Sequence, residues 1–152
     1  RKPGDNVALM TSIFDHTFSE IEPEIIYDLL RLRSEIFVVE QSSLYLDLDG
    51  CDTNPLTRHI WINGPNGPIS YLRVLSEPEG VRIGRVATRK ESRGQGLATE
   101  LLRYVVDSTK GKLTLHAQAH LADWYTSLGY VVTGEEFDDG DGIPHVPMTF
   151  VR

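Results

Sequence analysis

The sequence predicts a mixed α/β (α+β) fold built around one mostly antiparallel sheet. Short strand-like segments separated by Gly- and Pro-containing turns follow one another over 58–88, which is typical of an antiparallel meander. An amphipathic segment over 97–108 lies between two strand-like segments, which indicates a strand–helix–strand crossover. The length of 152 residues suits one domain, which we expect over 10–152, after a flexible tail over 1–9.

The first half of the chain predicts a strand, a helix and a long loop. The strand is expected over 11–16. Glu22-Pro23-Glu24 begins the helix, because proline and acidic side chains suit a helix N-terminus. Apolar residues at helical spacing make this helix amphipathic. One stripe of it carries Ile26, Leu30, Arg33 and Phe37. Polar and turn residues then predict a loop over 41–55.

The second half predicts the meander, the crossover and two closing strands. Strands are expected over 58–62, 69–75, 81–88, 113–119, 130–133 and 146–151. The segment 97–108 is the crossover helix, and a short helix over 121–128 ends at Gly129, which suits a left-handed cap. We expect the last strand to lie at an edge of the sheet, where it can support a homodimer.

Composition and charge exclude several functional classes. A net charge of −7 argues against nucleic-acid binding, and no apolar run approaches the roughly 20 residues that span a membrane. The single cysteine, Cys51, cannot form an internal disulfide, and no Cys/His spacing indicates a metal site, so we expect a cytoplasmic protein without metal. Basic residues gather over 82–112, between two segments without Lys or Arg. This basic segment can bind an anion, or it reflects only an uneven distribution of surface charge.

A glycine-containing segment, Arg93-Gly94-Gln95-Gly96, follows a strand and begins a helix. A helix N-terminus has unpaired N–H groups and partial positive charge, and glycine lets the backbone approach a phosphate. Arg93 adds a fixed positive charge. A dinucleotide fingerprint requires glycine where Thr99 stands, and a P-loop requires a Gly-Lys-Ser/Thr sequence that is absent. The segment therefore suits a diphosphate, or is only a turn that starts a helix.

The glycine-containing segment is part of a longer resemblance. Arg93-Gly94-Gln95-Gly96-Leu97-Ala98 resembles the Arg/Gln-x-x-Gly-x-Gly/Ala loop of the GNAT superfamily of N-acetyltransferases. Val86-Ala87-Thr88 stands where the fourth strand of that family ends, and 124–130 is similar to its Phe/Leu-Tyr-x-x-x-Gly-Phe segment. The first half over 32–50, together with Gly142-Ile143-Pro144-His145, is similar to the ElaA branch of the superfamily.

The resemblance implies a sheet with helices on both faces and with its fourth and fifth strands splayed apart. Acetyl-CoA would be the cosubstrate, with its pantetheine on the backbone of 86–88 and its pyrophosphate on the amides of 93–98. A backbone N–H near Ala87 would polarise the acetyl carbonyl. Many relatives carry Asn at the end of the fifth strand, where this chain has Gln118. Tyr125 would give a proton to the leaving thiolate.

The implied reaction moves an acetyl group from acetyl-CoA to a primary amine by direct attack in a ternary complex. An alkyl amine with a pKa of about 10.4 is mostly protonated at neutral pH, so the enzyme needs a proton acceptor. Candidates for this base are Glu40 and His59, followed by Glu35 and His116. Each has a plainer alternative, either a helix-end carboxylate in water or a histidine packed in a strand.

The expected acceptor is a small amine or a peptide amine. Asp47 and Asp49, with Asp52 nearby, can attract a cationic acceptor, or can simply belong to a solvated loop. These residues do not form an EF-hand calcium site, which requires Glu where Arg58 stands.

Two other functions fit parts of the sequence. Six residues resemble the pattern of acyl-homoserine lactone synthases, which share this fold: Arg33, Phe37, Tyr45, Asp49, Asp52 and Arg73. Those enzymes are longer and generally lack the Arg-Gly-x-Gly loop. A non-catalytic acetyl-CoA-binding sensor would keep that loop, and turnover across a panel of amines distinguishes it from an enzyme.

Overall fold

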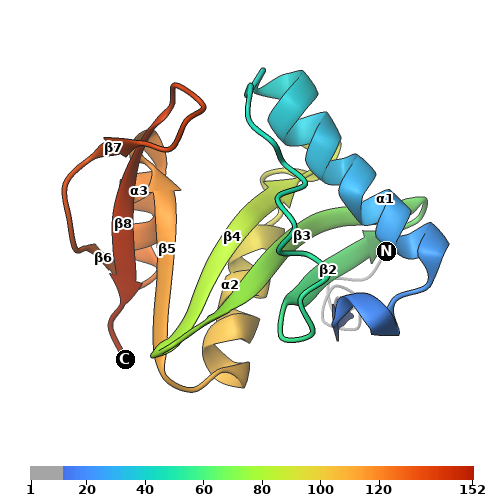
Figure 1. Ribbon diagram of the computed structural model, residues 1–152, viewed down its shortest axis with the longest axis horizontal. Helices are drawn as coiled ribbons and strands as arrows, with labels where there is room; N and C mark the ends of the chain where they lie inside the picture. Colours follow the sequence, from blue (N-terminus) through green and yellow to red (C-terminus); the bar gives the residue numbers. More distant parts are fainter. Residues whose placement is uncertain (1–11) are drawn as a thin grey trace, which may run out of the picture.

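The computed structural model describes residues 12–152, so the whole segment predicted to be a tail, 1–9, lies outside the described residues. An eight-stranded sheet has the order β1-β2-β3-β4-β5-β8-β6, with β7 paired to β8 (Figure 1). The strands are β1 (Ile13–His16), β2 (Arg58–Gly64), β3 (Gly67–Glu77), β4 (Gly80–Thr88), β5 (Lys112–Gln118), β6 (Tyr130–Val132), β7 (Phe137–Asp138) and β8 (Pro144–Phe150). The α-helices are α1 (Pro23–Arg33), α2 (Leu97–Ser108) and α3 (Ala122–Ser127).

The pairing confirms the predicted mixed, mostly antiparallel sheet. Among the described strands, only β4 and β5 pair in parallel, and α2 connects them, as expected of a strand–helix–strand crossover. The other neighbouring strands are antiparallel.

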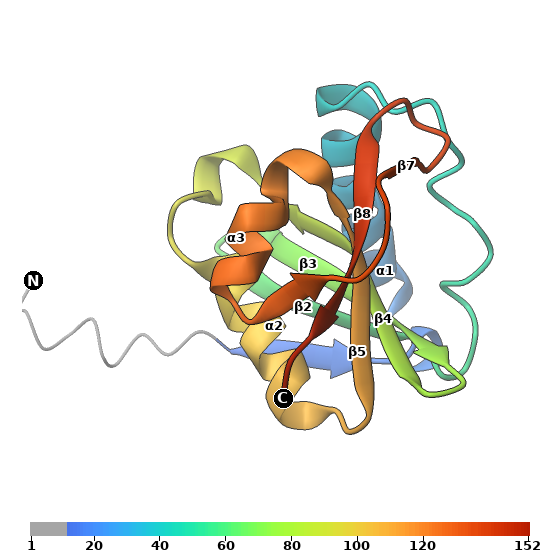
Figure 2. The same ribbon diagram turned by 90° about the vertical axis from the view of Figure 1, so that its left-hand side faces the viewer.

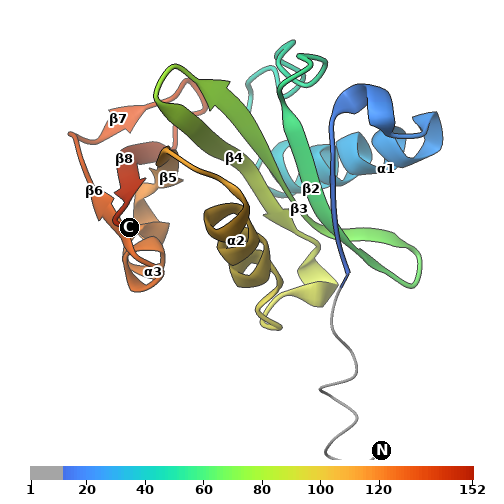
Figure 3. The same ribbon diagram turned by 90° about the horizontal axis from the view of Figure 1, so that it is seen from below.

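Helices cover both faces of the sheet, as the family resemblance implied. Figures 2 and 3 show α2 and α3 on one side and α1 on the other. The α1 side buries Leu29 and Leu32 against Trp61 and Tyr71 of β2 and β3. The α2 side has a core of its own, so the middle strands are buried on both faces. This explains why four successive residues of β2, from His59 to Ile62, are buried rather than every second one.

Helix α1 begins as predicted, with Pro23 in its first turn. It does not end after Arg33 but continues as a π-helical segment, Ser34–Glu40. Apolar spacing alone did not distinguish this wider turn from an ordinary helix, although π-helical insertions occur frequently at functional sites. The segment brings Glu40 and Gln41 to the top of the sheet, beside the end of β4.

The expected edge position of the last strand is wrong. β8 lies between β5 and β6, and it also pairs with β7, which was not predicted. Its backbone groups are therefore used within the sheet, so β8 gives no support for a homodimer.

From residue 12 to the C-terminus, no helix has the length and apolar character needed to cross a membrane. Over the same range, no cluster of three or more His, Cys, Asp or Glu side chains is arranged to hold a metal ion. Cys51 is a free, partly buried thiol.

Candidate active site

A cleft lies where β4 and β5 separate. Their parallel pairing runs from Gly80 with Lys112 to Ile83 with Leu115 and then stops. Figure 1 shows the two strands close together at one end and far apart at the other, which confirms the expected splay. Beyond Ile83, the side of β4 that faces β5 has no strand partner among the described residues, so backbone groups there are not used by the sheet and can bind a ligand, except the Thr88 carbonyl, which accepts from Arg93.

Two cavities open into this cleft and share its middle. The Gly-loop half, of about 570 Å³, reaches the loop before α2. The Asp-loop half, of about 460 Å³, reaches the loop over 41–57 and the connection from β7 to β8. Both are lined by Gln41, Val86, Gln118, Leu121 and Tyr125. The Gln118 Nε2 donates a hydrogen bond across the cleft to Gln41 Oε1, at 3.2 Å.

The Gly-loop half has a backbone that only glycine adopts readily. Gly94 and Gly96 have φ angles of 79° and 76°, in the left-handed region. Gly96 is the N-cap of α2, and no side chain caps this helix. The first amides of α2 are therefore left for an anion, which the helix dipole favours. Of the residues predicted to hold a pyrophosphate, Gln95 does not line this cavity, and five do: Arg93, Gly94, Gly96, Leu97 and Ala98.

Arg93 is not a free positive charge. Its Nε donates to the Thr88 carbonyl at 3.0 Å, and its Nη2 lies 2.7 Å from a Glu40 carboxylate oxygen. Glu40 therefore borders the Gly-loop half and is engaged by a cation. Glu35 pairs with Arg89 at 2.7 Å and lines neither cavity. Neither carboxylate is placed in the Asp-loop half.

The end of β4 is turned toward the cleft by a bulge. The pairing of β3 with β4 changes register, and Arg85 has a φ angle of 53° there, which is uncommon for a residue other than glycine. Val86 follows and lines both cavities, whereas Ala87 and Thr88 line the Gly-loop half. The bulge thus presents the predicted pantetheine-binding segment to the cleft.

Tyr125, on α3, lies where the two halves meet. The side chain is only 6% exposed, and its ring packs edge-on against Trp124 and Tyr130, with ring centroids 4.8 and 5.8 Å away. Among the described residues, its hydroxyl has no hydrogen-bond partner. Burial, with a smaller contribution from Tyr130, raises the pKa of Tyr125, so the phenol stays protonated at neutral pH.

The structure gives His59 no access to an acceptor. The ring is completely buried and lines neither cavity. Its Nδ1 lies 2.7 Å from the Tyr71 hydroxyl, and its Nε2 lies 3.0 Å from the Asp52 carbonyl, so both nitrogens are engaged. Burial lowers the pKa of His59, which makes it a neutral packing residue. The expectation that His59 is a candidate base is therefore wrong, because β2 is covered on both faces and this histidine is enclosed.

His116 is the base candidate that reaches the Asp-loop half. It lies on β5 two residues before Gln118, on the same face of the strand, and lines the cavity. Its ring meets Phe137 edge-on, with centroids 5.1 Å apart. Burial, and next the positive charge of Arg82, lower the pKa of His116. The ring is therefore largely neutral at pH 7, the form that accepts a proton.

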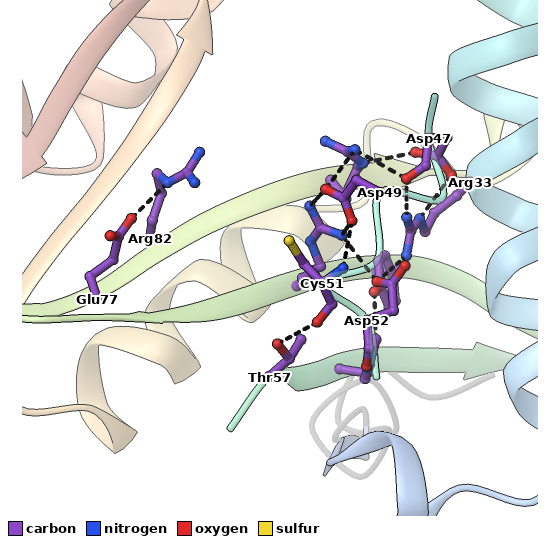
Figure 4. A network of polar contacts seen from close by, with 12 residues as sticks. Arg33, Asp47, Asp49, Cys51, Asp52, Thr57, Glu77 and Arg82 are labelled. Atoms are coloured by element: carbon purple, nitrogen blue, oxygen red, sulfur yellow. Dashed lines mark hydrogen bonds and ion pairs between the residues drawn. The ribbon is translucent and has the colours of Figure 1, made fainter. Parts of the chain in front are cut away.

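The predicted acidic loop forms part of an ionic cluster (Figure 4). Three arginines meet three aspartates from this loop: Arg33, Arg73 and Arg85 with Asp47, Asp49 and Asp52. Arg33 is completely buried and lies 3.1 Å from Asp47 and 2.6 Å from Asp52. Burial by itself would raise the pKa of Asp49, but hydrogen bonds from Arg73 and from a backbone N–H outweigh it and hold that pKa well below its usual range.

The ionic cluster changes the expected role of the loop. Asp47 and Asp49 are compensated by arginines, so they are not spare charges for attracting a cation, and only Asp49 lines the cavity. Instead the cluster fixes the loop as a wall of the Asp-loop half. The sequence carried a signal for it, because Arg33 stands on an apolar helix stripe and Arg73 in an apolar strand.

The fold and the splayed-strand cleft are those of the GNAT class of proteins, and comparison with known proteins agrees. Residues 57–152 match the family described as "Acetyltransferase (GNAT) domain". A UPF0039 protein of Mycobacterium tuberculosis is 42% identical over 135 residues, which cover 85% of this chain and 86% of that protein. The chain belongs to the GNAT family.

Within that family the chain is similar to ElaA. Protein ElaA of Escherichia coli is 36% identical over 140 residues, covering 86% of this chain and 90% of ElaA. The crystal structure of Escherichia coli ElaA superimposes with a TM-score of 0.85 over 93% of this chain and 100% of that chain, at 33% identity. An acyl-CoA N-acyltransferase from Pseudomonas aeruginosa has a TM-score of 0.86 at 32% identity, over 93% of this chain and 99% of that one. The protein is an ElaA-like member of the superfamily.

Proposed function

We propose that this protein transfers an acetyl group from acetyl-CoA to a primary amine, by direct attack within a ternary complex. The observation that carries the proposal is the continuous cleft between β4 and β5, with an uncapped helix start at one end and a free tyrosine hydroxyl in its middle. The similar Pseudomonas aeruginosa protein is described as an acyl-CoA N-acyltransferase, which supports an acyl-CoA donor here.

The residues of the Gly-loop half fit the donor. The amides at the start of α2 suit a pyrophosphate, because they are unpaired and lie at the positive end of the helix dipole. The unpaired edge of β4 over 86–88 suits the amide groups of a pantetheine. Acetyl-CoA supplies an acetyl thioester, whose carbonyl a β4 backbone N–H near Ala87 would polarise.

The Asp-loop half fits the acceptor. His116 would accept the proton that the ammonium group must lose, directly or through a water molecule. The amine nitrogen then forms a bond to the acetyl carbon while the carbon–sulfur bond breaks. Tyr125 would donate its hydroxyl proton to the sulfur that leaves, and the second proton, which the nitrogen must lose to become a neutral amide, would pass through solvent to restore the tyrosine. We assign the base to His116 in place of Glu40 and His59, because it is the candidate that lines this half.

Replacing Tyr125→Phe tests this assignment. General acid catalysis typically contributes about 10²- to 10⁴-fold, so we expect kcat to fall by about 100-fold or more with acetyl-CoA affinity nearly unchanged. Tyr130→Phe is the matched control, since Tyr130 contacts Tyr125 but has a buried hydroxyl and lines neither half of the cleft. Equal losses of kcat and affinity in Tyr125→Phe, or an unchanged kcat, would remove the acid role.

A further inference from the structure

The Asp-loop half is lined by an arginine, Arg82, whose terminal guanidinium nitrogens have no hydrogen-bond partner among the described residues. Arg82 lies on β4, lines this cavity, and donates from Nε to Glu77 at 2.8 Å. Figure 4 shows its guanidinium standing off β4 and apart from the ionic cluster. Two parallel N–H groups of this kind match the two oxygens of a carboxylate.

The other two arginines of the cavity differ from Arg82 in this respect. Arg73 donates to Asp49 and Asp52, and Arg85 is held by Asp47 and Asp49. Their charges are therefore compensated within the protein. Arg82 instead has a single, partly exposed glutamate, and both side chains are 39% exposed. A ligand can approach Arg82 without breaking the buried ion pairs.

Another part of the cavity lining has the other sign. Asp139 and Asp141, from the connection between β7 and β8, line the same cavity. These carboxylates favour a cationic amine, and Arg82 favours an anion. Arg82 precedes Val86 by four residues, at most about 13 Å along an extended strand. The two charges of a fitting acceptor are therefore several bonds apart.

We propose that the acceptor is an amine that also carries a remote carboxylate, and that Arg82 binds this carboxylate. The inference rests on the proposed function and adds the substrate class of the same site. The side-chain amine of lysine and the amine of 6-aminohexanoate have this chemistry. Such an acceptor would place its nitrogen near Tyr125 and Val86, with water linking it to His116, and its carboxylate at Arg82.

The test compares matched amines. We expect 6-aminohexanoate to exceed 6-aminohexanamide in kcat/KM by about 10- to 100-fold, as a charge-assisted hydrogen bond allows. Arg82→Gln should reduce that ratio to about 1 to 3. Because the ratio compares two substrates of one enzyme, a changed pKa of His116 cancels from it. Lys112→Gln removes a surface cation that also pairs with a glutamate but lies outside the Asp-loop half, and it should keep the preference.

Two outcomes would overturn the inference. One is that the wild-type protein has the same kcat/KM for 6-aminohexanamide as for 6-aminohexanoate. The other is that the preference for 6-aminohexanoate remains in Arg82→Gln. An aminohexyl phosphate used better than 6-aminohexanoate would contradict the carboxylate in particular. Calorimetric binding of 6-acetamidohexanoate and its amide to the CoA complex needs no turnover. If the acid binds more tightly than the amide but no turnover is seen, the proposed function is contradicted and the inference about Arg82 stands. If the acid and the amide bind equally, the inference about Arg82 is contradicted.

Discussion

The ion pair between Glu40 and Arg93 allows a test of two roles for Glu40, as a partner that screens Arg93 or as the catalytic base. If Glu40 screens Arg93 from the donor's phosphates, Glu40→Gln frees that guanidinium and removes a nearby negative charge. The two side chains are 37% and 42% exposed, so their pairing has the strength of a surface ion pair. Such pairs contribute about 0.2–1 kcal/mol, which corresponds to a factor of about 1.4 to 5 in affinity.

We therefore expect Glu40→Gln to tighten acetyl-CoA binding by about 1.4- to 5-fold in calorimetry, with kcat changed by less than about twofold. The gain should shrink as salt is added, because exposed charges are screened. Glu35→Gln is the control, since it removes an equivalent carboxylate paired with Arg89 outside both halves of the cleft. A fall in kcat of about 100-fold or more at unchanged affinity would refute this reasoning and make Glu40 the base.

Three further predictions follow from the described contacts. Gly96→Val places a branched side chain at a φ angle of 76°, and the strain of about 1–2 kcal/mol should weaken acetyl-CoA binding by roughly 5- to 30-fold; unchanged calorimetric binding would contradict the loop assignment. Arg33→Met leaves buried aspartates undercompensated and should lower the free energy of unfolding in urea by about 3–5 kcal/mol, whereas Arg31→Met, at a 67% exposed side chain, should cost less than about 1 kcal/mol. Burial, and next the charge of Arg82, hold the pKa of His116 below its usual value. We therefore expect kcat to rise with pH on the acid side of neutrality, as the ring becomes neutral, and then to level off. His116→Gln should remove this pH dependence, and its persistence would exclude His116 as the base.

The Gly-loop half could be predicted from the sequence because its chemistry is local. The glycines, the start of α2 and the strand before it are adjacent in the chain, and the unpaired amides of a helix N-terminus suit an anion without help from distant residues. The proposal for Tyr125 came from the resemblance of 124–130 to a segment of the family, and not from spacing alone. The crossover between β4 and β5 followed from the order of amphipathic segments.

The Asp-loop half could not be predicted because its charges come from distant segments. Arg33 lies on α1 and Arg73 on β3, and only the folded chain brings them to the acidic loop. Composition therefore indicated free carboxylates where the structure has ion pairs. His59 was misjudged for a related reason, since nothing local to β2 reveals that the loop closes over it.

The most direct test of acetyl transfer follows an isotopic label. The protein is incubated with acetyl-CoA labelled in the acetyl group and with a panel of primary amines, and the products are identified by mass spectrometry. We predict label in an amide of at least one amine, with one free CoA thiol released for each amide formed. Label recovered only as acetate, or retained in acetyl-CoA that the protein binds, would contradict the proposed transfer.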